Sequence, residues 1–128
     1  MNDRPTAVEL LHAVRDFLKE DVLPRLEGRE RFHARVAANV VAIVAREIET
    51  EEDHLLAEWR RLGALLDDAA EPPASREELR DGVCARTEAL VERIRGGDAD
   101  GGPFRQAVRG HLRETVDAKL EVAQPARP

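Results

Sequence analysis

The chain has 128 residues, 36% of them charged, and a formal net charge of −6. This length corresponds to one domain, and the acidic balance argues against a general nucleic-acid binder, which needs a basic surface. No apolar run approaches the ~18 residues of a membrane span. The N-terminus lacks a signal-peptide pattern, and the single cysteine allows no internal disulfide. These features predict a soluble cytoplasmic protein without membrane spans.

Five helical segments are predicted from apolar periodicity and from start and stop residues. Capping boxes begin at Thr6 and Ser75, and the pair Thr50 and Asp53 repeats this pattern, which predicts a break between two helices at that point. The loop after residue 66 contains two prolines, and a glycine-rich loop precedes the last helix. The predicted helices span about residues 7–23, 29–49, 51–66, 75–95 and 103–122, and a short mobile tail follows over 123–128.

The segment 29–49 is the element around which the other helices are expected to pack. Its middle, from Ala34 to Ala45, consists mostly of Ala, Val and Ile, and small residues occur on nearly every side. A helix of this kind is normally enclosed by its neighbours. No segment alternates like a strand. The sequence therefore predicts a single all-α domain over residues 1–128, an up-and-down bundle of four to five helices around a central Ala/Val-rich helix.

Several polar residues fall on or beside the predicted inner faces of two helices. His33 and Glu47 lie in or near the arc that contains Phe32, Val36 and Val40 in the central helix. His111 lies in the middle of the apolar face of the last helix. Because buried polar groups need hydrogen-bond partners, the favoured interpretation is a buried cluster of His33, Asn39, Glu47 and His111 that fixes the helices in register. The alternative is a pocket, whose tentative ligand-binding residues are His33, Arg35, Asn39, Arg46, Glu47 and His111.

Within that set, Arg35, Asn39 and Arg46 form a stripe that could bind an anionic group, because a pair of guanidinium groups suits phosphate or carboxylate. Ion pairing of Arg46 with Glu49 or with a neighbouring helix is the favoured alternative.

Catalytic motifs are absent from the sequence. Glu-x-x-His occurs three times, but only His33 is predicted to face inward, so no metal site and no cofactor are predicted. The segment from Asp98 to Gly101 begins like a calcium loop and then departs from that pattern. Ser75 is explained as a helix cap, and Cys84 lies at the edge of an apolar face. The chain contains no nucleophile, phosphate-binding or dinucleotide motif, so no catalytic residues are assigned.

The sequence resembles a family of short bacterial proteins of unknown function. The resemblance is carried by the opening RPTAVELLHAVRDFLKEDVLPRLEG, the block FHARVAANVVAIVAREIE, the turn IRGGDAD and the ending HLRETVDAKLEVAQP. Its most specific parts are Arg4–Ala7, His33–Asn39 and the pair Arg46 and Glu47. Members of this family are often encoded beside an aminoglycoside-phosphotransferase-like kinase and an acyl-CoA dehydrogenase. The resemblance thus implies an accessory role in acyl-CoA or hydroxy-acyl metabolism.

Three functional hypotheses follow from these observations. The first is a non-enzymatic accessory protein that binds a kinase-like or acyl-CoA dehydrogenase-like partner, or forms a homodimer. The second is a bundle that binds a small ligand or an acyl chain. The third is a metal-dependent helical-bundle enzyme. The missing motifs favour the first hypothesis.

Overall fold

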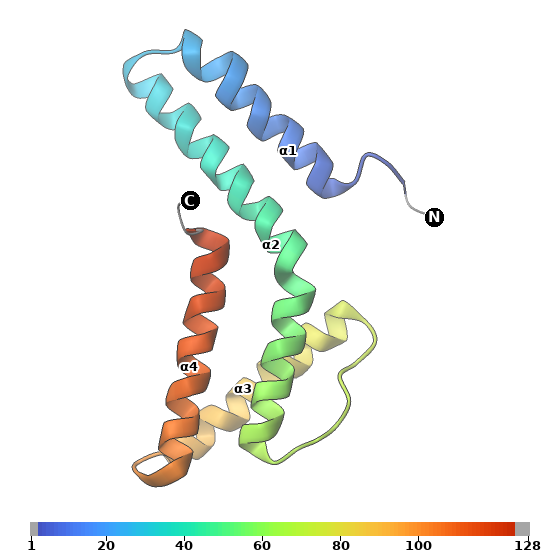
Figure 1. Ribbon diagram of the computed structural model, residues 1–128, viewed down its shortest axis with the longest axis vertical. Helices are drawn as coiled ribbons and strands as arrows, with labels where there is room; N and C mark the ends of the chain where they lie inside the picture. Colours follow the sequence, from blue (N-terminus) through green and yellow to red (C-terminus); the bar gives the residue numbers. More distant parts are fainter. Residues whose placement is uncertain (1–2, 125–128) are drawn as a thin grey trace. The chain divides into compact units, whose positions relative to one another are not determined.

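The computed structural model describes residues 3–124, and this part of the chain is all-α, as predicted, with four α-helices and no strand (Figure 1). None of the helices in this part is long and apolar enough to cross a membrane. The chain divides into two compact units, Met1–Thr50 and Glu51–Pro128. The up-and-down arrangement of all helices stays a prediction. The helices are α1 (Ala7–Phe17), α2 (Gly28–Leu66), α3 (Arg76–Arg95) and α4 (Gly102–Ala123).

Helix α1 begins where the capping pattern predicts. The hydroxyl oxygen of Thr6 accepts a hydrogen bond of 3.2 Å from the backbone N–H of Glu9. Beyond the α-helix the chain continues through a π-helical segment, Leu18–Val22, and a 3₁₀ turn, Leu23–Arg25. The turn contains Pro24, which has no N–H and cannot extend an α-helix. The chain then enters α2 at Gly28, whose φ of +61° is a conformation that glycine adopts without strain.

The first unit is a hairpin in which α1 lies antiparallel to the first part of α2 (Figure 1). Its fully buried residues are the small Ala38 and Ala45. Within this unit α1 covers only one side of α2, and the enclosure of this segment by further helices stays a prediction. Large apolar side chains remain between 38% and 59% exposed in this unit, namely Leu10, Val14, Phe17, Phe32, Val36, Val40 and Val44.

The predicted helix break at Thr50 is wrong, since α2 runs without interruption from Gly28 to Leu66. The Thr50 hydroxyl donates a 2.8 Å hydrogen bond to the backbone carbonyl of Arg46, one turn earlier. This bond is typical of threonine inside a helix, whereas a capping residue leaves the helical conformation and accepts from the next turn. No glycine or proline near this position enforces a break. The two predicted helices 29–49 and 51–66 are therefore one.

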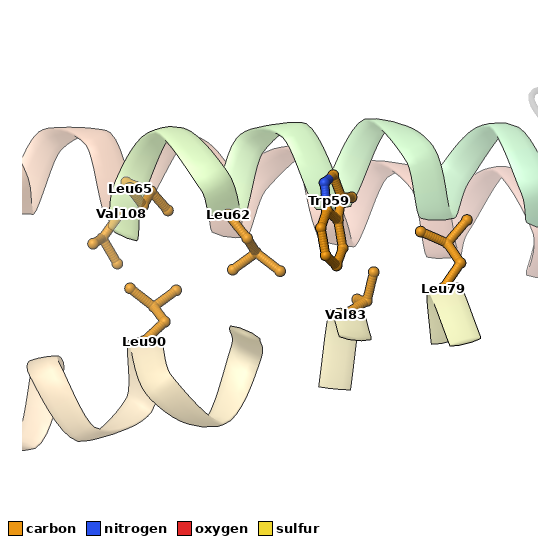
Figure 2. Close-up of a cluster of buried hydrophobic side chains, with 7 residues drawn as sticks. All are labelled: Trp59, Leu62, Leu65, Leu79, Val83, Leu90 and Val108. Carbon is orange, nitrogen blue, oxygen red and sulfur yellow. The ribbon is translucent and has the colours of Figure 1, made fainter. Parts of the chain in front are cut away.

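The second unit contains a compact hydrophobic core between the last part of α2, α3 and α4. Figure 2 shows the side chains that form it, with the α2 residues facing the α3 residues across the core. Leu62 is completely buried at its centre. Helix α3 is capped as predicted, because the Ser75 hydroxyl accepts from the backbone N–H of Glu78. The buried residues of this core are Trp59, Leu62, Leu65, Leu79, Val83, Leu90 and Val108.

Replacing a helical glycine by alanine is expected to have opposite effects on stability at Gly82 and at Gly110. An added Cβ at Gly82 would lie 2.6 Å from the Trp59 ring, whereas one at Gly110 would meet nothing within 4 Å. We expect Gly82→Ala to destabilise the protein by about 1–3 kcal/mol through overpacking. We expect Gly110→Ala to stabilise it by about 0.5–1 kcal/mol, because alanine loses less backbone entropy in a helix. Thermal unfolding followed by circular dichroism measures both, and a rise in melting temperature for both variants would contradict the close packing of Gly82 on Trp59.

Candidate functional site

The strongest candidate site in the second unit is a polar cluster around His111. This histidine lies on α4 and only 6% of its surface is exposed. The Nε of Arg61, on α2, donates a 3.2 Å hydrogen bond to His111 Nδ1 and lies 3.1 Å from a carboxylate oxygen of Glu114. A terminal nitrogen of Arg61 donates to the hydroxyl of Thr115 at 3.3 Å. One guanidinium thus holds three side chains of α4 in place.

The cluster fixes the protonation state of His111. Because Arg61 donates to Nδ1, this nitrogen must accept, and the imidazole proton of a neutral ring lies on Nε2. Burial lowers the pKa of His111, and the positive charge of Arg61 lowers it further, whereas the carboxylates of Glu58 and Glu114 act in the opposite direction. His111 is therefore a neutral hydrogen-bonding group near pH 7.

A cavity of about 290 Å³ adjoins this cluster. Three of its lining residues are small, Ala64, Ala107 and Gly110, and they leave the space open between α2 and α4. The remaining walls combine the aliphatic side chain of Leu65 with the polar cluster. A positive guanidinium beside apolar walls suits a small molecule with one carboxylate and a short hydrocarbon part. The residues that line the cavity include no serine, threonine or cysteine, and the nearby Thr115 hydroxyl donates to the backbone carbonyl of His111.

A second cavity, of about 370 Å³, lies beside Trp59 and the loop that follows α2. The Arg86 guanidinium stacks on the Trp59 ring, 3.5 Å from its centroid, and donates a 2.9 Å hydrogen bond to the Trp59 carbonyl. The indole N–H of Trp59 donates to the carbonyl of Ala70 in the loop. Arg86 Nη2 lies 3.4 Å from the Asp68 carboxylate and is itself buried. The ion pair of Arg86 with Asp68 and the hydrogen bond of Trp59 to Ala70 hold the loop beside α2.

The six tentative ligand-binding residues are divided between the two units. Five of them lie on α2 in the first unit, and His111 lies in the second. Contrary to the prediction that they face inward, His33 and Glu47 are exposed in the first unit, and Asn39 and Arg35 are exposed as well. Arg46 is half-buried. His33 accepts a 3.2 Å hydrogen bond from Arg29. A ligand-binding role for these residues stays a prediction.

Arg61, the residue that organises the His111 cluster, was not among the residues predicted from the sequence. Arg61 lies one turn before Leu65, at the edge of the apolar stripe of α2. A histidine in the middle of an apolar helix face needs a hydrogen-bond partner, and an arginine at the edge of a facing stripe is the residue type that can supply it. A histidine on one apolar face together with an arginine at the edge of another is the sequence pattern that could have predicted this contact.

The histidines of the three Glu-x-x-His patterns each have a separate partner. His12 lies 3.8 Å from Glu49, and His54 lies 3.3 Å from Glu121, while His33 bonds Arg29. Within residues 3–124, no three histidine, cysteine or acidic side chains come together as a metal site would require. Cys84, expected at the edge of an apolar face, is exposed.

The lowered pKa of His111 predicts a contribution to the pH dependence of stability. Below about pH 6.5 the unfolded chain takes up a proton at His111 that the folded protein binds less readily, so the stability falls with decreasing pH. His111→Gln keeps a hydrogen-bond acceptor and removes this titration. We expect the wild-type protein to lose more stability than the variant between pH 7 and pH 5 in urea unfolding. Parallel curves for the two proteins would contradict the assignment.

The sequence was compared with family models, with curated proteins and with solved structures, and only the family models gave a match. The match to a family model covers residues 24–127, and therefore α2, α3, α4 and both cavities. The chain belongs to the family described as a domain of unknown function, DUF6285.

Proposed function

We propose that this protein is a non-enzymatic accessory protein that binds a partner protein through one face of α4. The observation that carries this proposal is an apolar stripe formed by Leu112, Val116 and Leu120. These residues are one helical turn apart, and about half of each side chain is exposed. Anchors at this spacing are typical of a helix that lies in an apolar groove of another protein.

The stripe belongs to a unit that has a complete core of its own. On α4, the side chains of Val108 and His111 are buried, whereas the stripe lies on an adjacent part of the helix surface. Folding of this unit therefore does not require the stripe to be covered. A surface that folding does not require can bind a partner reversibly, and exposed apolar patches on soluble proteins mark such sites.

The partner that we propose is the kinase-like or the acyl-CoA dehydrogenase-like protein implied by the family resemblance. The sequence has no catalytic motif for either reaction, which supports an accessory role. The metal-dependent alternative has less support, because the described histidines are each engaged with a separate partner.

A charge placed in the stripe tests this function. We expect Val116→Glu to weaken binding to the partner at least tenfold, because a carboxylate would be desolvated in the apolar contact. Gln106→Glu adds the same charge to α4 outside the stripe and should bind like the wild-type protein. Isothermal titration calorimetry with each purified candidate partner measures both affinities, and thermal unfolding verifies that both variants fold.

Two results would contradict this proposal. One is the absence of a complex between the wild-type chain and either candidate partner, tested by co-expression and by calorimetry. The other is a complex that Val116→Glu binds as tightly as the wild type does.

The cavity beside His111 favours a second candidate function, the binding of a short-chain carboxylate. Arg61 would provide the counter-charge, with Leu65 and the small residues around it enclosing the hydrocarbon part. Glu114 has 62% of its side chain exposed and can turn away from Arg61 to admit the ligand.

Thermal-shift measurements with hexanoate test this second candidate. A ligand that binds only the folded state raises the melting temperature, by an amount that grows with its concentration. We expect hexanoate to raise the melting temperature of the wild-type protein, and hexanamide, which lacks the charge, to have little effect. The shift should disappear in Arg61→Gln. Equal shifts for hexanoate and hexanamide would contradict a role for the guanidinium.

A further inference from the structure

The first part of α2 carries a second apolar stripe, which is distinct from the stripe on α4. Phe32, Val36, Val40 and Val44 follow one another at intervals of one turn and are 59%, 43%, 52% and 38% exposed. At ~100° per residue this stripe lies on the side of α2 opposite to the buried Ala38. The packing inside the hairpin therefore leaves the stripe uncovered.

The stripe is flanked at its two ends by opposite charges. Arg29 precedes it and Glu47 follows it, and both side chains are exposed. These two residues are 18 positions apart in the sequence, which corresponds to ~5 full turns of an α-helix. They consequently lie on the same line along the helix, and this line runs between Val36 and Val40. One end of the stripe is basic and the other is acidic.

The apolar residues and the two flanking charges of this stripe are complementary to the same stripe on a second, antiparallel copy. If a second α2 lies antiparallel on the first, with the two-fold axis passing between Val36 and Val40, then Val36 of each copy faces Val40 of the other. Phe32 then lies at the level of Val44, and Arg29 at the level of Glu47. The same patch on both copies is what a two-fold symmetric interface requires. We propose that this stripe binds a second copy of the chain and forms an antiparallel homodimer.

The area of the stripe is sufficient for a dimer of moderate affinity. Its four apolar side chains are each 38% to 59% exposed, and the flanking Arg29, His33 and Glu47 are exposed as well, so the contact corresponds to the lower end of the size range of specific interfaces. The poor core of the hairpin adds a reason for pairing. Among its described residues only two alanines are fully buried, and its larger apolar side chains are half-buried or exposed, so a unit of this size is marginal alone.

The opposite charges also select the partner. A second copy carries the same two charges at the same spacing, and in the antiparallel arrangement their order is reversed. Charge complementarity fixes the orientation of such a contact, because a parallel arrangement would place Arg29 beside Arg29 and Glu47 beside Glu47. The antiparallel arrangement replaces both repulsive contacts with two attractive pairs.

Sedimentation velocity of the full chain between about 1 and 200 µM tests the dimer, because this range covers the micromolar dissociation constants expected for a small interface. We expect a concentration-dependent conversion of monomer to dimer. Val40→Glu should remain monomeric over the whole range. Val116→Glu places the same residue on the α4 stripe and should dimerise like the wild type. A wild-type chain that stays monomeric at the highest concentration would overturn the proposal, as would a dimer that tolerates Val40→Glu.

Exchange of the charges tests the register. Arg29→Glu and Glu47→Arg should each weaken the dimer about tenfold, because each converts two attractive pairs into repulsive ones. The double variant restores both pairs with reversed sign and should regain most of the affinity. Circular dichroism monitors the helix content of all three variants, and recovery by the double variant excludes misfolding as the cause. A double variant as weak as the two single variants would overturn the antiparallel register.

The experiments distinguish a failure of the dimer proposal from a failure of the proposed partner complex. Loss of the dimer in Val40→Glu with unchanged partner binding would support two separate surfaces. A wild-type dimer that binds neither candidate partner would leave the dimer in place and contradict the accessory function alone.

Discussion

The position of Trp59 is the constraint on which the second unit depends. One face of its ring carries the Arg86 guanidinium, the ring contacts Gly82 so closely that a methyl group would not fit, and its N–H holds the loop after α2. Gly63 is constrained in the same region, because an added Cβ would lie 2.6 Å from the Asp68 carbonyl and 2.7 Å from Arg86. Two glycines, one arginine and one tryptophan thereby fix α2, α3 and the loop, and the apolar core forms beside them.

The two units differ in what their helices bury. The second unit fully buries leucine, valine and tryptophan side chains, whereas only alanines are fully buried among the described residues of the first unit, whose larger apolar residues are half-buried or exposed. Alanine allows helices to approach closely but removes little apolar area from water, and the stabilisation scales with that area. Because the hairpin packs through alanines, the larger apolar residues of α2 form an exposed stripe. A sequence rich in alanine and valine is therefore not by itself evidence that a helix is enclosed.

Much of the fold was predictable because it depends on local signals. The caps at Thr6 and Ser75, the loop with two prolines and the glycine-rich turn before α4 all lie where their residues predict. The false break at Thr50 shows the limit of this reasoning, since threonine can bond the preceding turn as well as the following one. The buried position of His111 was predicted from periodicity, whereas its partner Arg61 comes from another helix, 50 residues away. The apolar periodicity of a single helix does not show which helices pair, nor which side of α2 its neighbour in the hairpin leaves uncovered.

Trp59 has a further consequence, which concerns how unfolding can be observed. It is the only tryptophan in the chain, the chain has no tyrosine, and the residue lies in the second unit. The intrinsic fluorescence of the protein therefore reports almost entirely on the surroundings of this one ring, including the stacked guanidinium. Far-ultraviolet circular dichroism, in contrast, reports on the helices of both units. A difference between the transitions seen by these two signals would reveal that the units unfold separately, and identical transitions would indicate one cooperative unit.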